Sequence, residues 1–243
     1  MQELILYGLC FFTVAFLYAS VGHGGASGYL ALMALFGFSA AVMKPTALLL
    51  NVLVSMIAFV SFYRAKHFRK ELLWPLIAAS IPFAYIGSVM PLSEILYKKI
   101  LGAVLLLSVL RLLWNSAERP LQPAPKWYVL STIGAAIGLL SGMIGMGGGI
   151  LLSPVLLLMG WTTQKQTAAI SAIFIFLNSV SGFIGQLRTG FTPEPQIWAI
   201  IVFVLAGGFI GAHLGAQRLP AKNMKFILAT VLILAAGKLF FVK

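Results

Sequence analysis

Two clusters of glycine interrupt long apolar stretches of this 243-residue chain, one at residues 21–28 and one at residues 144–149. The second cluster reads Ile-Gly-Met-Gly-Gly-Gly. Each glycine costs about 1 kcal/mol relative to alanine inside a helix, so both clusters predict unwound backbone. Close packing of helices through small residues is the alternative, and it suits isolated pairs such as Gly207 and Gly211. It suits adjacent glycines poorly, because neighbouring residues of a helix point to different faces.

Backbone that resumes a helix after such a break has unpaired N–H groups at the new N-terminus, with about half a positive charge. Short apolar stretches follow both clusters, at residues 27–37 and 150–160, and no acidic residue lies near either break. A cation site would instead need carbonyl oxygens and usually a carboxylate. We therefore expect a small anion to bind between the breaks. The predicted binding residues are Gly24, Gly25, Ser27, Asn51, Gly147, Gly148, Gly149 and Asn178.

Polar side chains in the next apolar stretches are candidates for the walls of this site. Asn51 and Ser55 are four residues apart and share a helix face, and Asn178 recurs at the corresponding place further along the chain. They could bind an anion, or they could bond neighbouring helices, which is worth about 0.6–2 kcal/mol each. The second stretch adds Thr167, Ser171 and Ser181.

A histidine lies inside the first glycine cluster. His23 stands where the second cluster has Met146. Its ring could titrate near neutral pH, pair with an anion, or carry a coupled proton. A neutral ring that is hydrogen-bonded to a carbonyl is an equal alternative.

The side chains that most enzymes depend on are missing from the apolar stretches. The chain has no Asp, and its five Glu residues all fall in termini or short connections. This excludes a paired-carboxylate catalyst, a carboxylate metal cage and a proton relay built on a buried acid. Cys10 is the single cysteine, which excludes a disulfide framework and a thiolate metal cluster. We predict no enzymatic activity, no metal and no cofactor.

The elements that hold these residues are predicted to be membrane helices. Hydrophobic residues make up 60% of the chain and charged residues 9%, against about a quarter charged in an ordinary globular domain. Crossings of roughly 20 residues leave room for seven or eight of them and no soluble domain. We interpret the first apolar run as an uncleaved membrane segment. The apolar runs are residues 4–37, 45–63, 72–90, 98–115, 128–160, 166–187, 197–216 and 224–241.

Six of these runs have the length of a single crossing. The other two, residues 4–37 and 128–160, are too long for one straight helix across a bilayer, and they contain the glycine clusters. We therefore expect each of them to hold two helices with a break between.

Basic residues give the chain a formal net charge of +12, but they lie at the ends of the apolar runs. That arrangement sets orientation in a membrane and does not form a basic face for nucleic acid. The predicted partners are the lipid bilayer and a small anion, with no nucleic acid, and the sequence leaves the oligomeric state open.

The chain is a duplication within a single polytopic membrane domain, residues 1–243. Gly22, Gly24 and Gly25 match Gly145, Gly147 and Gly148 at an offset of 123 residues. Later matches, from Asn51 with Asn178 to Arg111 with Lys238, drift between offsets of 123 and 127. The predicted repeats are residues 1–117 and 127–243, and a proline-rich linker, residues 118–126, joins them.

Whether the repeats are inverted depends on the broken segments. If each returns to its own side, each half crosses three times and the halves are inverted. Eleven Lys or Arg residues then lie on one side of the membrane and six on the other. If each crosses, there are eight spans in parallel halves and the split is about ten to seven. The positive-inside rule favours inversion slightly. Repeat halves with broken helices at matching places are typical of secondary transporters with a site at the midplane.

The pattern Gly-x-Gly-Gly-Gly-x-x-x-x-Pro over residues 145–154, its copy at residues 22–28 and the duplicated layout resemble the sulfite exporter TauE/SafE family of membrane transporters. The resemblance covers essentially the whole chain. It implies movement of sulfur-containing anions, such as sulfite, thiosulfate or sulfonates, across a bacterial inner membrane. The first half departs from the pattern, because His23 and Ala26 interrupt its glycines and Ala31 stands where the second half has Pro154.

The sequence therefore predicts an all-α secondary transporter of small sulfur-containing anions that works by alternating access around the two breaks. The alternatives are an anion channel with the same donors along a continuous path, and a membrane scaffold or accessory subunit whose breaks serve only packing.

Overall fold

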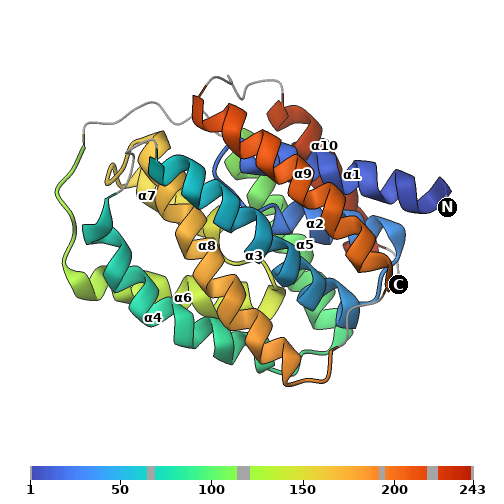
Figure 1. The fold of residues 1–243 in the computed structure, drawn as a ribbon. Helices are drawn as coiled ribbons and strands as arrows, with labels where there is room; N and C mark the ends of the chain where they lie inside the picture. Colours follow the sequence, from blue (N-terminus) through green and yellow to red (C-terminus); the bar gives the residue numbers. More distant parts are fainter. Residues whose placement is uncertain (1, 65–68, 114–120, 192–194, 218–223, 242–243) are drawn as a thin grey trace.

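The computed structural model describes residues 2–64, 69–113, 121–191, 195–217 and 224–241. Within these ranges the chain forms ten helices and no strand, packed as one bundle (Figure 1). The first five helices are α1 (Gln2–Ala19), α2 (Ala26–Phe36), α3 (Ala40–Arg64), α4 (Lys70–Val89) and α5 (Glu94–Leu113). The others are α6 (Trp127–Ile144), α7 (Gly149–Leu158), α8 (Gln164–Leu187), α9 (Pro195–Gln217) and α10 (Met224–Phe241). Of the predicted linker, residues 118–120 lie outside the described ranges, and residues 121–126 contain no helix.

Five of the described helices are long and apolar enough to cross a membrane, namely α3, α4, α6, α8 and residues Ile197–Ala216 of α9. Large apolar side chains stand on the outside of the bundle, and Trp74, Trp127 and Val202 are 65%, 71% and 67% exposed. Exposed apolar side chains of this size are suited to contact with lipid. The helices pair their own backbone N–H and C=O groups, as a bilayer requires. The prediction of a multi-pass helical membrane protein is confirmed.

Both overlong apolar runs contain a break at the predicted glycines. In the first run α1 ends at Ala19 and α2 begins at Ala26, and in the second α6 ends at Ile144 and α7 begins at Gly149. Gly22 and Gly25 in the first break, and the glycines at 145, 147 and 148 in the second, have positive φ. A residue with a Cβ rarely adopts that conformation, so the glycines permit the turns. The prediction of two broken helices is confirmed.

Each broken segment returns to the side of the bundle where it began. The Tyr7 ring, early in α1, lies 4.4 Å from the Phe36 ring at the end of α2. In the second segment, the backbone N–H of Gln122, just before α6, donates to the carbonyl of Gly160, just after α7, at 2.8 Å. The two segments are therefore helical hairpins with their glycine tips inside the protein.

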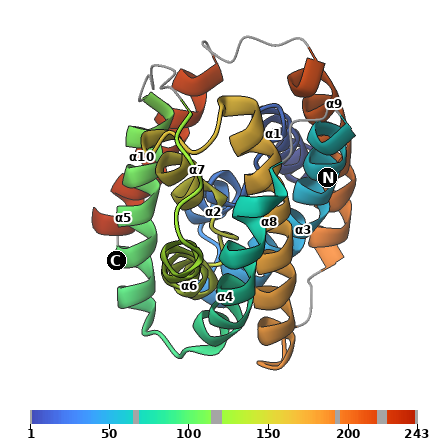
Figure 2. The ribbon, with the colours of Figure 1, turned by 90° about the vertical axis from the view of Figure 1, so that its left-hand side faces the viewer.

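The two central helices, α3 and α8, run in opposite directions. Phe62 near the end of α3 packs with Ala168 near the start of α8. Asn51 in the middle of α3 bonds Ser179 of α8. Figure 2 shows α8 between α3 and α4, with α5 and α10 together at the side of the bundle. The hairpin tips meet against this central pair.

Glycines allow two pairs of helices to touch along their backbones. On α6, a Cβ at any of three glycines would collide with a carbonyl of α4, and on α9 three more glycines lie against carbonyls of α1 in the same way. Contact residues increase together along both helices, so each pair runs parallel. The contacts are Gly134–Leu76, Gly138–Ser80 and Gly142–Ala84 in the first pair, and Gly207–Phe12, Gly211–Phe16 and Gly215–Ser20 in the second.

Replacing Gly138 by alanine is expected to destabilise the bundle by about 1–3 kcal/mol, because the new methyl would meet the Ser80 carbonyl and force α6 away from α4. The measurement is the Tm of the purified protein in detergent. Gly237→Ala is the matched control, since a Cβ at Gly237 has no neighbour within 4 Å. Equal Tm values for the two variants would contradict the close contact.

Candidate functional site

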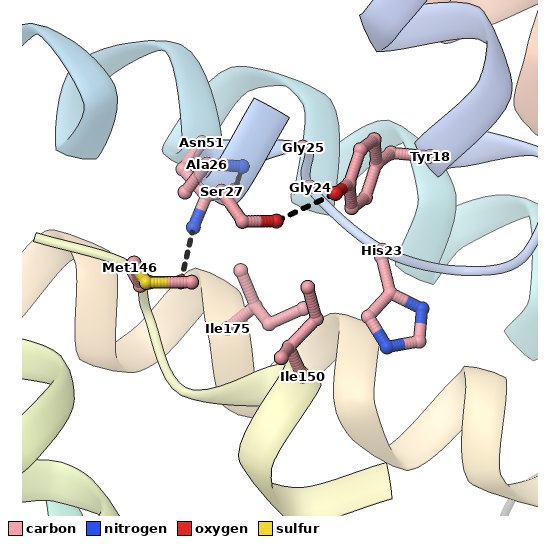
Figure 3. A pocket seen from close by; sticks show the side chains of 10 residues that line it. All are labelled: Tyr18, His23, Gly24, Gly25, Ala26, Ser27, Asn51, Met146, Ile150 and Ile175. Atoms are coloured by element: carbon pink, nitrogen blue, oxygen red, sulfur yellow. Dashed lines mark hydrogen bonds between the residues drawn. The ribbon is translucent and has the colours of Figure 1, made fainter. Parts of the chain in front are cut away.

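A small cavity lies where the two hairpin tips meet. Its lining comes from the end of α1, both breaks, α2, α3, α7 and α8 (Figure 3). The volume open to the centre of a water molecule is about 10 Å³, which is room for roughly one water. A sulfur oxyanion does not fit in this conformation. The lining residues are Tyr18, His23, Gly24, Gly25, Ala26, Ser27, Asn51, Met146, Ile150 and Ile175.

Asn51 joins the two breaks to each other. It is 1% exposed, and its Oδ1 accepts from the backbone N–H of Ala26 at 3.3 Å. Its Nδ2 donates to the carbonyl of Met146 at 3.3 Å and to Oγ of Ser179 at 2.9 Å. A carboxamide can do this because it has both an acceptor and two donors. One side chain on α3 therefore holds both hairpin tips and α8 together.

The carboxamide of Asn51 occupies space that is free because two neighbouring residues are glycines without a Cβ. A Cβ at Gly24 would collide with Oδ1 of Asn51, and a Cβ at Gly147 would lie 2.5 Å from its Nδ2. Gly147 also has a φ of +67°. Close approach and backbone conformation thus both require glycine at this contact.

Both short helices begin at a left-handed glycine. Gly25, with a φ of 96°, is the N-cap of α2, and Gly148, with a φ of 81°, is the N-cap of α7. Neither helix has a side-chain hydrogen bond at its N-cap or an acidic residue in its first turn. The two described acidic side chains that form ion pairs lie elsewhere, Glu71 with Arg69 and Glu94 with Lys98. The positive ends of two helices therefore face the centre without a nearby carboxylate, which suits an anion.

His23 links the first break to the second half of the chain. Its Nδ1 lies 3.1 Å from the carbonyl of Val21, which can only accept, so Nδ1 carries the proton of that bond. Its Nε2 lies 2.9 Å from Oγ of Ser153 on α7, and Ser153 lies 3.0 Å from Oγ of Ser171 on α8. A row of polar groups therefore runs from His23 through two hydroxyls.

Four of the eight predicted binding residues line the cavity. Gly24, Gly25, Ser27 and Asn51 line it, as does His23, and the Ser27 hydroxyl lies 2.6 Å from the hydroxyl of Tyr18. The predicted binding residues Gly147, Gly148 and Gly149 do not line the cavity. Gly147 touches Asn51 and Ser179, Gly148 packs near Ile137 and Phe174, and Gly149 packs against Ile175.

Asn178 lies apart from the cavity lining. It is 1% exposed, its Nδ2 donates to the carbonyl of Phe174 one turn earlier in α8, and its Oδ1 has no hydrogen-bond partner. The correspondence between Asn51 and Asn178 in sequence does not give the two side chains the same contacts.

Sequence reasoning missed Tyr18, Ser153 and Ser179, which bond residues of the site. Tyr18 and Ser27 are nine residues apart across the first break, and the spacing of two separate helices gives no signal for such a pair.

Among the described residues, no three His, Cys, Asp or Glu side chains cluster as metal ligands do.

Comparison with known proteins places the chain among membrane transporters. The model of the sulfite exporter TauE/SafE family matches residues 7–239. The probable membrane transporter protein y4hK of Sinorhizobium fredii is 35% identical over 243 residues, which cover 98% of each chain. The probable membrane transporter protein YunE of Bacillus subtilis is 27% identical over 136 residues, 55% of this chain and 48% of that one. No solved structure matches the chain.

The family model spans nearly the whole chain and both broken helices, and the rhizobial relative aligns almost end to end. A transporter family does not consist of enzymes, so the prediction that this chain is not an enzyme is confirmed. The chain belongs to the sulfite exporter TauE/SafE family of membrane transporters.

Proposed function

We propose that this protein is a secondary transporter of small sulfur-containing anions, such as sulfite, thiosulfate or organosulfonates, and that it works by alternating access around the two hairpin tips. One observation carries the proposal: Asn51 accepts from the N–H of Ala26 at the start of α2 and donates to the carbonyl of Met146, two residues before the glycine N-cap of α7, so one residue joins the tips of both hairpins. The helix ends supply a positive potential to the centre, and the description of the family supplies the sulfur chemistry.

The proposal includes two inverted repeats, residues 1–117 and 127–243. Three features support inversion. Each hairpin returns to its own side, the corresponding helices α3 and α8 run in opposite directions, and the pairing of α1 with α9 corresponds to that of α6 with α4. A two-fold axis in the membrane plane would relate the halves and pass near Asn51 and Ser179.

The substrate would bind to backbone donors at the tips, after these move apart. In the present conformation the tips are closed on Asn51, and the cavity admits about one water. An anion would therefore compete with Asn51 for the N–H of Ala26, and its oxygens would be met by the first turns of α2 and α7. We assign these contacts to Gly24, Gly25, Ser27, Asn51, Gly147, Gly148 and Gly149, with Asn178 as a further donor once its helix shifts.

The test is uptake into proteoliposomes. Sulfite, thiosulfate, sulfoacetate and sulfate are each offered with and without a pH gradient. Saturable uptake of one of them, accelerated by the same anion inside, is the expected result. Unitary currents would identify a channel instead. A protein that transports none of the four, and whose Tm does not respond to them, would favour a scaffold.

We assign proton coupling to His23, because it lines the cavity and bonds Ser153 across the two halves. Replacing His23 by glutamine keeps a side chain that can hydrogen-bond but removes the imidazole, which can bind and release a proton. Uptake by His23→Gln is expected to lose most of its stimulation by a pH gradient, at least fivefold, while uptake without the gradient continues. His213→Gln is the control, since His213 is exposed on α9. Stimulation that is unchanged in His23→Gln would remove this residue from the coupling.

A further inference from the structure

A lysine is buried at one end of the central helices. Lys44, in α3, is 8% exposed, and its Nζ donates to the carbonyl of Ser88 at 2.7 Å. The amide of Gln186 in α8 donates to the same carbonyl. The ion pairs among the described residues are Arg69 with Glu71 and Lys98 with Glu94, so Lys44 belongs to neither.

Burial of this ammonium group needs an explanation. An unpaired charge inside a membrane protein is costly, and an apolar side chain of the same length would pack at least as well. Ser88 is in the last turn of α4, so the negative end of that helix gives partial compensation. An ammonium group has three donors, and the Ser88 carbonyl takes one of them. The group retains the capacity to bind an anion.

Lys44 also lies on the same face of α3 as the cavity residue Asn51. It precedes Asn51 by seven residues of α3, which is two helical turns, so the two side chains share a face about 10 Å apart along the axis. Its stem covers the second hairpin, because a Cβ at Gly145, the C-cap of α6, would lie 2.9 Å from Cγ of Lys44. Lys44 therefore contacts both the second hairpin and α4, two helical turns from Asn51.

The other end of the central pair carries a second lysine in a different state. Residues 44–47 read Lys-Pro-Thr-Ala and residues 165–168 read Lys-Gln-Thr-Ala, each in the first turns of a central helix, and Lys44 precedes Asn51 by seven residues whereas Lys165 precedes Asn178 by thirteen. Since α3 and α8 are antiparallel, Lys44 and Lys165 lie at opposite ends of the pair. Lys44 is buried and Lys165 is exposed.

We propose that Lys44 and Lys165 are the charged gates of the two mouths of the transport path, and that they alternate between a buried, bonded state and an exposed state that binds the anion. The proposal rests on the proposed function. In this conformation the Lys44 mouth is closed by its bond to the end of α4. Opening frees the ammonium group to meet the anion, while Lys165 closes the opposite mouth. By the positive-inside rule, Lys165 lies on the cytoplasmic side, as one of the eleven basic residues there.

The first test measures the gate without transport. Leu48 is 0% exposed and lies four residues from Lys44 on the same face of α3, so a cysteine there reports on this mouth. In a Cys10→Ser, Leu48→Cys background, a membrane-impermeant maleimide should label the protein at least ten times faster when Lys44→Met is added. Lys44→Met keeps the stem that packs on Gly145 and removes the donor. Lys44→Arg, which keeps the charge, should label slowly. Equal rates for all three would overturn the closure by Lys44.

The second test measures sulfite kinetics from each face of oriented proteoliposomes. Lys44→Met should raise the KM at the face of its own mouth at least tenfold and change the other face less, and Lys44→Arg should restore most of the loss. Lys165→Met should show the opposite sidedness. A lower maximal rate with both KM values unchanged would make Lys44 a merely structural residue and overturn its contact with the anion. If the unaltered protein transports no anion, the proposed function fails, while the labelling rates still decide whether Lys44 closes the mouth.

Discussion

Replacing Gly148 by leucine is expected to reduce anion uptake below a tenth of the unaltered rate, with insertion into the membrane preserved. Gly148 caps α7 at a φ of +81°, where a Cβ costs about 1–2 kcal/mol. A Cβ there would also lie 2.8 Å from Ile137 and 2.9 Å from Phe174. Relief of both requires α7 to move, and with it the helix N-terminus that we propose meets the substrate. The measurement is uptake of sulfite or thiosulfate into proteoliposomes, with equal protein content.

Two controls separate the causes of this effect. Gly190→Leu introduces the same side chain at a φ of +84°, but nothing lies within 4 Å of its Cβ, so it tests backbone strain alone. Gly237→Leu introduces leucine in a helix with open space and tests added bulk. Both are expected to transport at near the unaltered rate. Gly148→Leu with normal uptake would show that the second hairpin tip does not take part in transport.

Replacing Asn51 by leucine is expected to remove transport and to lower the Tm by about 5 °C or more. Leucine has a similar size but leaves the N–H of Ala26, the carbonyl of Met146 and the hydroxyl of Ser179 without their partner. Each buried polar group left unpaired costs about 1–3 kcal/mol, and each kcal/mol corresponds to about 2–4 °C in a chain of this size. Thermal unfolding in detergent and uptake into proteoliposomes measure the two effects.

Asn178→Leu is the matched comparison, because Asn178 is equally buried but bonds only the carbonyl of Phe174 in its own helix. Its Oδ1 has no partner to lose. The Tm should fall much less than in Asn51→Leu. If Asn178→Leu abolishes uptake at an unchanged Tm, then Asn178 binds substrate. If both variants lower the Tm equally, the hydrogen bonds from Asn51 to the two hairpins contribute no more to stability than the bond of Asn178 within its own helix.

The sequence predicted the helices and their breaks well, because both depend on local properties. Apolar runs bounded by charge or proline locate the helices, although α3 begins at Ala40 and α5 at Glu94, before the predicted runs at 45 and 98. Adjacent glycines at 147 and 148 are incompatible with a regular helix. The sequence does not determine whether each hairpin returns, because the return depends on contacts such as Gln122 with Gly160 that connect distant residues. Repetition could not predict side-chain contacts either. Asn51 bridges two hairpins and Asn178 bonds its own helix, although the predicted repeats pair the two residues.

Charge at the ends of apolar runs was interpreted as a feature of orientation alone. That interpretation treats all seventeen basic residues alike, and it gave no reason to separate Lys44 from Lys165. Their difference arises from packing at the end of α4, where Ser88 and Gln186 enclose one of the two. Ser153 is similar, because only the fold brings it to His23, 130 residues away along the chain.

The parallel pairing of α1 with α9 has a consequence for synthesis in the cell. Helix α6 finds its partner α4 already made, whereas Phe12 of α1 must await Gly207, 195 residues later in the chain. At about 5–20 residues per second, α1 and its hairpin remain without that partner for roughly 10–40 s. During that interval the first hairpin must be held by the insertion machinery or by lipid, and its carbonyl-lined face is open to wrong pairing. The second hairpin is completed as it emerges, so the two halves of one fold are assembled on different schedules.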